Sequence, residues 1–224
     1  MMNAAGETFT GTGYTPDGTV PKGAIPCTQE QAQNFHAYVP SDGEIVSAPD
    51  TLLLAQAQAA QKSIVTKGYN AATDYVPITI NGTLYQVDNT PGKQALNLSL
   101  AITANAAMQS PAWAADTEYA AGQLCSVSGV ILFCSTPGKS GTSAPTPPTA
   151  FGTPVTDGTA AWELMGRKVY LQGGSFVYMT PQQIMSAFQQ GELYLHQMSD
   201  KLELLKSEIM VATTVTEVQT FTFS

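Results

Sequence analysis

The chain has 224 residues and a formal net charge of −8, and only 12% of its residues are charged although 43% are hydrophobic. This length allows one large domain or two small ones, and the absence of a lysine and arginine stripe argues against nucleic-acid binding. No apolar run approaches about 18 residues and no basic region precedes an apolar stretch, so we expect neither membrane insertion nor a secretory signal.

The sequence of residues 1–50 predicts an N-terminal arm with one short helix. Residues 1–24 are rich in glycine and threonine without a sustained period, which indicates an extended segment that needs a partner surface to become ordered. Thr28-Gln29-Glu30-Gln31 matches a capping box, so a helix is expected from there to about Ala37. A turn at residues 40–43 and a short strand at residues 44–46 follow.

Residues 51–109 predict two helices separated by a hairpin. The first helix covers residues 52–67 and ends at Gly68, and its alanines would let another helix approach closely. Asn81-Gly82 between two β-rich runs predicts a hairpin over residues 76–87. Thr90 and Pro91 then start an alanine-rich helix over residues 93–108.

The pattern changes at residues 110–166, which have no helical period and contain both tryptophans. Strands are expected at residues 122–127, 130–134 and 159–164, with a loop rich in proline, glycine and serine at residues 136–151. A second hairpin is predicted at residues 168–179. The chain therefore predicts an α+β fold, in which a helical domain with β-hairpins and a long C-terminal helix (51–109 and 167–224) is interrupted by a small all-β module (110–166).

Cys27, Cys125 and Cys134 are too few and too irregularly spaced for a disulfide framework or a zinc site. A turn at Ser128-Gly129 would place Cys125 opposite Leu132, too far from Cys134 for a bond. A turn at Gly129-Val130 would bring the two cysteines face to face. We favour the first turn, which predicts free thiols.

The segment from Thr180 to Thr213 predicts a long amphipathic helix, because threonine followed by proline is a helix start signal. Its apolar residues recur at alternating steps of four and three, as in a heptad seam. The seam would either pack on its own domain or form a self-association or docking surface, and its members are Ile184, Phe188, Leu195, Met198, Leu202, Leu205 and Ile209. Residues 213–224 alternate apolar and polar side chains like a strand that could pair with a neighbouring chain.

No catalytic constellation is apparent, so we expect a protein that is not an enzyme and that holds no cofactor and no metal. His36 and His196 fall in unrelated helices. Glu203 and Glu208 belong to a charged helix face together with Lys201 and Lys206, which is typical of a solvated surface rather than an acid/base pair.

Two segments resemble known families. The stretch from Pro26 to Gln31, then Asp42-Gly43-Glu44-Ile45-Val46 and a long helix beginning near Leu52, resembles a family of bacteriophage tail proteins of uncharacterised function. That resemblance implies a helical domain that has a small hairpin and ends in a long helix.

Residues 112–165 resemble a β-module of phage tail fibres and spikes that is similar to chitin-binding-type carbohydrate-binding domains. The matching residues are Trp113, Asp116-Thr117, Tyr119-Ala120-Ala121-Gly122, Phe133, Gly138, Ser140-Gly141-Thr142, Pro145, Thr156-Asp157-Gly158-Thr159 and Trp162. The resemblance implies glycan stacking by Trp113, Tyr119 and Trp162, whereas a module of this size also needs its aromatic residues as a core. Asp157, which precedes a glycine, is expected to form a turn.

Together these observations predict a structural component of a phage virion tail (tail fibre, baseplate or adaptor) that is assembled in the bacterial cytoplasm. Its expected partners are other tail proteins, further copies of itself, for which a trimer would fit, and host surface glycans. Two alternatives are a tail-fibre assembly chaperone and a glycan-binding accessory module of a secreted hydrolase.

Overall fold

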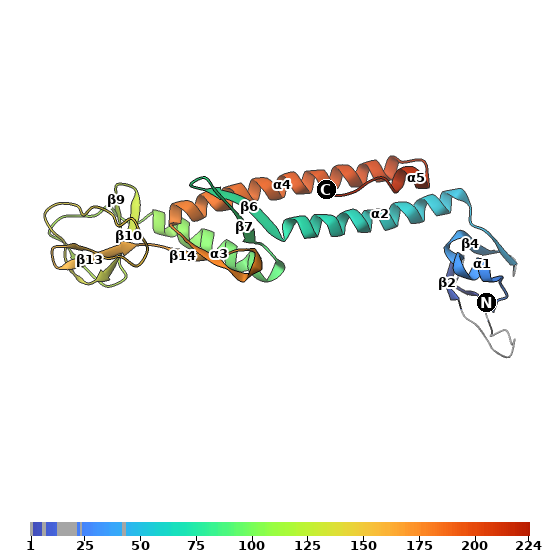
Figure 1. The fold of residues 1–224 in the computed structure, drawn as a ribbon, viewed down its shortest axis with the longest axis horizontal. Coiled ribbons are helices and arrows are strands. Elements are labelled where there is room, and N and C mark those ends of the chain that lie inside the picture. The colour runs from blue at the N-terminus through green and yellow to red at the C-terminus, as the bar shows by residue number, and fades with distance from the viewer. Residues whose placement is uncertain (1, 6–7, 13–21, 23, 42–43) are drawn as a thin grey trace. The chain divides into compact units, whose positions relative to one another are not determined.

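The computed structural model in Figure 1 describes residues 2–5, 8–12, 22, 24–41 and 44–224. It contains both helices and antiparallel strands and ends in a long helix followed by a short one, which confirms the predicted α+β fold. The chain divides into two compact units, Met1–Gly68 with Leu202–Ser224 and Tyr69–Lys201. The predicted domain boundaries at residues 50, 109 and 166 are not those of this division and stay predictions.

The N-terminal part of the first unit folds around a small sheet. Strands β1 (Met2–Ala5), β2 (Thr8–Thr12) and β3 (Ala24–Ile25) pair antiparallel in the order β2-β1-β3. They are followed by α1 (Gln29–Gln33), a 3₁₀ turn η1 (Phe35–Ala37), and the hairpin β4 (Tyr38–Ser41) and β5 (Glu44–Ser47). The described residues of the predicted extended segment thus mostly form strands, and residues 13–21 and part of the turn at 40–43 lie outside the described residues.

The predicted capping box is confirmed. The Thr28 hydroxyl accepts a hydrogen bond from the Gln31 amide at 3.1 Å, and the Gln31 side chain accepts one from the Thr28 amide at 3.0 Å. The α-helix that this box opens ends at Gln33 rather than Ala37, and a 3₁₀ turn covers the remaining residues.

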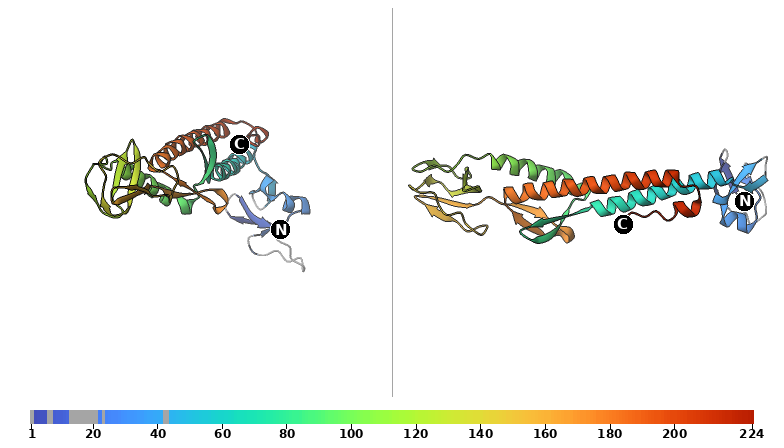
Figure 2. Two further views of the ribbon diagram at one scale, coloured as in Figure 1. Left: turned by 60° about the vertical axis from the view of Figure 1, so that its left-hand side comes forward. Right: turned by 90° about the horizontal axis from the view of Figure 1, so that it is seen from above.

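The rest of the first unit is built on α2 (Asp50–Thr73), the C-terminal part of α4 (Pro181–Val211) and α5 (Val215–Val218). The Gln58 side-chain amide donates to the carbonyl groups of Met210 and Ala212, which fixes the end of α4 beside α2 (Figure 2). Val65, Ile209 and Val218 are fully buried there.

Two predictions about this unit are wrong. The helix α2 does not end at Gly68 but continues to Thr73. The missing side chain at Gly68 instead makes room for the C-terminal tail, since a Cβ atom there would lie 2.8 Å from the Cβ atom of Phe223. The tail is not a strand: it forms α5 and then lies along α2, where the Gln61 amide donates to the Phe221 carbonyl.

The second unit combines two hairpins with α3 (Pro91–Met108) and the N-terminal part of α4. The predicted Asn81-Gly82 turn is confirmed, with φ values of 50° and 78° that suit a type I′ hairpin between β6 (Tyr75–Ile80) and β7 (Thr83–Asp88). The other hairpin joins β14 (Arg167–Tyr170) to β15 (Phe176–Met179) across the 3₁₀ turn η2 (Gln172–Gly174). One core joins these elements, and its buried members are Val76, Ile78, Ile80, Val87, Ala104, Val169, Met179 and Ile184.

A β-module lies between α3 and β14 in the chain. Its four-stranded antiparallel sheet has the order β12-β13-β10-β9, and β8 pairs with β11 beside it. The strands are β8 (Glu118–Tyr119), β9 (Leu124–Val127), β10 (Val130–Thr136), β11 (Gly138–Lys139), β12 (Val155–Asp157) and β13 (Ala160–Leu164). Ile131 and Met165 pack on Ala107 of α3, so the module's sheet rests on the end of that helix.

Candidate functional site

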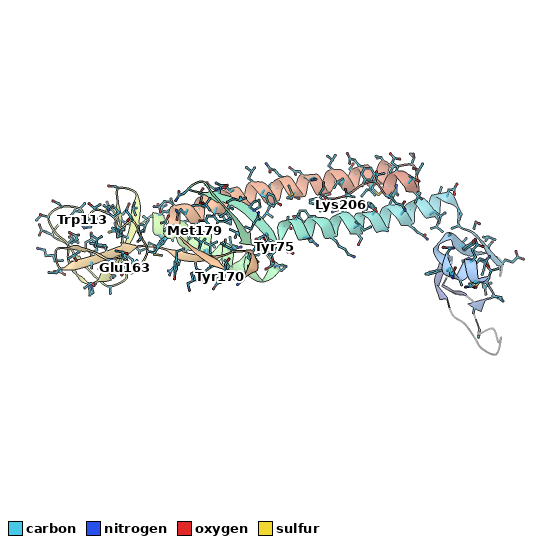
Figure 3. All side chains as sticks on the ribbon, in the orientation of Figure 1. Tyr75, Trp113, Glu163, Tyr170, Met179 and Lys206 are labelled. Carbon is cyan, nitrogen blue, oxygen red and sulfur yellow. The ribbon has the colours of Figure 1, made fainter. Side chains whose placement is uncertain are left out.

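Two of the three predicted glycan-binding residues form the core of the β-module. Trp162 is fully buried on β13, and Tyr119 is almost as buried on β8. Their rings meet edge to face with centroids 4.7 Å apart, a favourable arrangement for an aromatic pair. A sugar ring therefore cannot stack on either side chain while the module keeps this structure. The third residue, Trp113, is half-buried and packs against the same core (Figure 3).

The carboxylate of Asp157 holds this core together. It is buried, and one of its oxygens accepts hydrogen bonds from both indole groups, at 2.8 Å from Trp113 and 3.1 Å from Trp162. The other oxygen accepts from the backbone amide of Gly141 at 2.8 Å. These three hydrogen-bond donors compensate the cost of burying the carboxylate. Through them Asp157 links its own strand to the segments that carry Trp113, Trp162 and Gly141. Its role therefore goes beyond the predicted turn.

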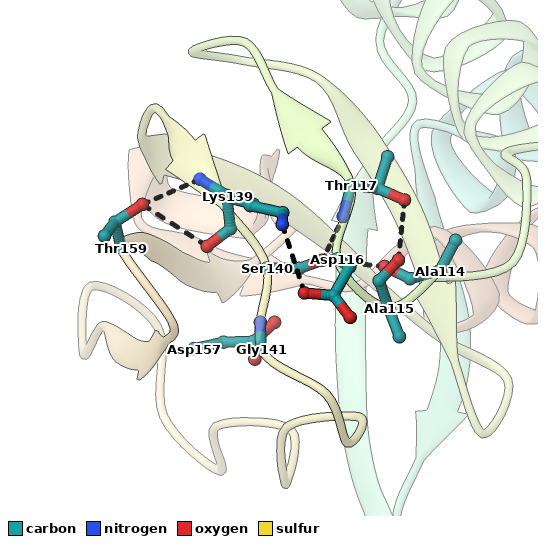
Figure 4. Close-up of polar contacts among 9 residues, drawn as sticks. All are labelled: Ala114, Ala115, Asp116, Thr117, Lys139, Ser140, Gly141, Asp157 and Thr159. Atoms are coloured by element: carbon teal, nitrogen blue, oxygen red, sulfur yellow. Dashed lines mark hydrogen bonds and ion pairs between the residues drawn. The ribbon is translucent and has the colours of Figure 1, made fainter.

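Several other motif residues, among them Thr117, Ser140 and Gly141, belong to the same polar network (Figure 4). The buried Ser140 hydroxyl donates to the Ala114 carbonyl at 2.8 Å and accepts from the Thr117 amide at 3.0 Å. Gly158 has a φ of 66°, and a Cβ atom there would collide with the backbone of Lys139 and Gly141. These motif residues therefore have structural roles in the module.

The module's cysteines are structural. Cys125 pairs with Leu132 across the Ser128-Gly129 turn, and Cys125 and Cys134 are free, which confirms the predicted register and thiols. Burial raises the pKa of the Cys125 thiol to about 12, and it also raises the pKa of Cys134. Both shifts disfavour the thiolate, which is the nucleophilic form of a cysteine.

The apolar seam of α4 packs within the chain. In the second unit Ile184 is buried in the shared core, Phe188 and Leu195 are half-buried and line a cavity of ≈ 130 Å³, and Met198 is half-buried. In the first unit Leu202 and Ile209 are buried and Leu205 is half-buried. The burial of Ile184, Leu202 and Ile209 supports packing of the seam on the chain's own domain. Self-association or docking through the half-buried members stays a prediction.

Helix α3 has an exposed apolar side that the sequence analysis did not predict. Buried Ala101, Ala104 and Ala107 lie on one side of this helix. The opposite side, at 3.6 residues per turn, carries Ala95, Leu98, Ile102 and Ala106, which we call the outer face of α3. All four are exposed, with Leu98 at 52% and Ile102 at 62%.

The outer face of α3 also has no charge. From Gln94 to Gln109 the chain carries no Asp, Glu, Lys or Arg, although most of these positions face solvent. A helix with apolar residues on both sides is typically covered on both sides. The uncharged run is the signal in the sequence that points to this face, although the sequence analysis predicts only an alanine-rich helix over residues 93–108.

Among the described residues no group of three or more His, Cys, Asp and Glu side chains is arranged to hold a metal ion. Within the same residues, no helix has the length and apolar character needed to cross a membrane. His196 is exposed on α4 with Nδ1 2.8 Å from the Glu192 carbonyl, and the side chain of His36 lies outside the described part.

No family model, curated protein or solved structure matches the chain.

Proposed function

We propose that this chain is a non-enzymatic structural component of a bacteriophage tail that docks on other tail proteins. The resemblance of residues 26–52 and of the β-module to tail proteins supports the biological setting. The outer face of α3 is the observation that carries the docking role, because it is a contiguous apolar surface on a helix that already buries its opposite side.

The partner that suits the outer face of α3 is an uncharged apolar helix. Ala95, Leu98 and Ile102 are spaced by three and four residues, as in a helix–helix seam, and the alanines allow close approach. Identical copies would meet here without repulsion between like charges, even though the chain carries a net charge of −8. A homo-oligomer, such as a trimer, therefore fits this surface and would present the β-modules of all its copies.

A lysine pair on the outer face of α3 tests this docking role. Leu98→Lys combined with Ile102→Lys is expected to remove the chain from assembled particles by at least about tenfold, because each charge would be desolvated at a helix–helix contact. The measurement is the amount of chain that copurifies with tails from a phage carrying the altered gene. The melting temperature should change little, because both side chains are more than half exposed and Leu98 only borders the cavity that Phe188 and Leu195 line.

Thr103→Lys is the matched control, since Thr103 is exposed on the same helix about 100° from Ile102 and should incorporate normally. Light scattering of the purified chain identifies the partner: an oligomer that the lysine pair dissociates is a contact between copies, whereas a monomeric chain points to another tail protein. Normal incorporation of the lysine pair would contradict the docking role.

A further inference from the structure

The β-module's sheet has an open cleft on the face that points away from the module core. Side chains alternate along β10 and β13, so Leu132, Cys134 and Trp162 face the module core while Phe133 and Glu163 face the other side of the sheet. Phe133 and Glu163 are direct cross-strand partners. They form the floor of an open cleft of ≈ 350 Å³, and its other lining residues are Phe151, Gly152, Leu164, Gly166 and Tyr178.

Aromatic rings form the wall of this cleft. Phe151 is 37% exposed and Tyr178 is 44% exposed, and their ring centroids lie 5.6 Å apart at an interplanar angle of 36°. The Phe151 ring lies directly on the backbone of Gly166, where a Cβ atom would collide with it. The two rings are therefore held in place by packing while part of their surface stays in solvent.

Lys168 lies beside the aromatic rings on the side of Tyr178 away from Phe151. The Lys168 ammonium group lies 4.3 Å from the ring centroid of Phe176 and 5.8 Å from that of Tyr178. Phe176 in turn meets Tyr178 edge to face at 5.8 Å. The position of Tyr178 is thus determined by Phe151 on one side and by Phe176 with Lys168 on the other.

The cleft offers one strong hydrogen-bond acceptor. Glu163 is half-buried, and no described residue forms an ion pair with it or donates a hydrogen bond to it. An ionised carboxylate only accepts hydrogen bonds, so a ligand here must bring donors. The sheet floor and the aromatic wall leave the remaining ligand surface in an apolar environment.

We propose that this cleft binds a neutral saccharide ring. The aromatic side chains would cover the apolar C–H face of the sugar, and Glu163 would accept hydrogen bonds from its hydroxyl groups. A cationic ligand fits less well, because the Lys168 ammonium group already lies near the rings of Phe176 and Tyr178. This proposal goes beyond the proposed docking role, and tests on the purified chain keep it separate from the tail assignment.

The test is a titration of the full chain with neutral oligosaccharides of glucose, galactose, mannose and N-acetylglucosamine, followed by calorimetry and by NMR of the tyrosine and phenylalanine rings. At least one oligosaccharide should bind with a Kd of about 1 mM or tighter. Phe151→Ala and Tyr178→Ala should each weaken that binding by at least about tenfold, and Glu163→Gln by a smaller factor. All three side chains are at least partly exposed, so the variants should remain folded.

Leu84→Ala, at an exposed position on β7, is the control and should bind as the unaltered chain does. Tetramethylammonium serves as the cationic probe. Three results would overturn the proposal: no binding of any of the four sugars at about 10 mM, binding that survives Phe151→Ala and Tyr178→Ala, or binding of tetramethylammonium alone.

Discussion

Asp157→Asn is expected to destabilise the β-module by about 3 kcal/mol, because the buried carboxylate serves three donors that an amide cannot all satisfy. Asparagine keeps one acceptor oxygen, and its amide nitrogen would face either the two indole N–H groups or the Gly141 amide. Both tryptophans of the chain lie in this module and both contact Asp157. Denaturant unfolding followed by tryptophan fluorescence therefore reports on the module directly.

Glu163→Gln is the matched control for the loss of stability expected from Asp157→Asn. It makes the same chemical change on the neighbouring strand β13, at a carboxylate that has no partner among the described residues. Its effect on the free energy of unfolding should stay within about 0.5 kcal/mol. Equal effects of the two substitutions would mean that charge alone, and not the hydrogen-bond network of Asp157, stabilises the module.

Leu202→Ala is expected to lower the free energy of unfolding by about 2–4 kcal/mol, because Leu202 is only 7% exposed and its truncation leaves a cavity inside the first unit. Leu204→Ala, two residues along α4 and 59% exposed, should change it by less than about 0.5 kcal/mol. Thermal unfolding followed by far-ultraviolet circular dichroism compares the two variants.

This pair also separates the two readings of the α4 seam. If Leu202→Ala dissociated an oligomer in light scattering while each monomer kept its melting temperature, the seam would be intermolecular and the packing described above would be contradicted. If both variants melted equally early, the assignment of inner and outer faces of α4 would be wrong.

Features that depend on local chemistry were predictable from the sequence. The Asn81-Gly82 hairpin, the Thr28 capping box and the register of Cys125 with Leu132 each follow from a few adjacent residues whose backbone preferences agree. The two-residue turn at Ser128-Gly129 sets the register of the whole hairpin. It therefore places Cys125 opposite Leu132 and not opposite Cys134.

Features that depend on distant contacts were not predictable in this way. The end of α2 was misplaced because Gly68 reads as a helix stop, whereas the structure uses it to admit Phe223 from the other end of the chain. The C-terminal tail has strand-like alternation, but its contacts with α2 favour a short helix and an irregular segment. Such packing overrides local propensity.

The candidate sites show the same limit. Trp162 and Tyr119 match a family pattern, yet only the structure shows that both rings are buried on the core side of the sheet. Phe151 and Tyr178 lie in a loop and in a later hairpin, and nothing in their spacing places them beside Phe133 and Glu163. The uncharged run of α3 can be read from the sequence, but only the structure shows that Ala101, Ala104 and Ala107 are buried and that the opposite side is exposed.

The composition of purified phage particles tests the tail assignment most directly. Tails are purified by density gradient, digested and examined by mass spectrometry, with the soluble lysate as reference. We predict peptides from both compact units of this chain in the particle fraction, in amounts comparable to those of other tail proteins. Peptides found only in the soluble lysate would contradict a structural role and would fit an assembly chaperone that leaves before the tail is complete.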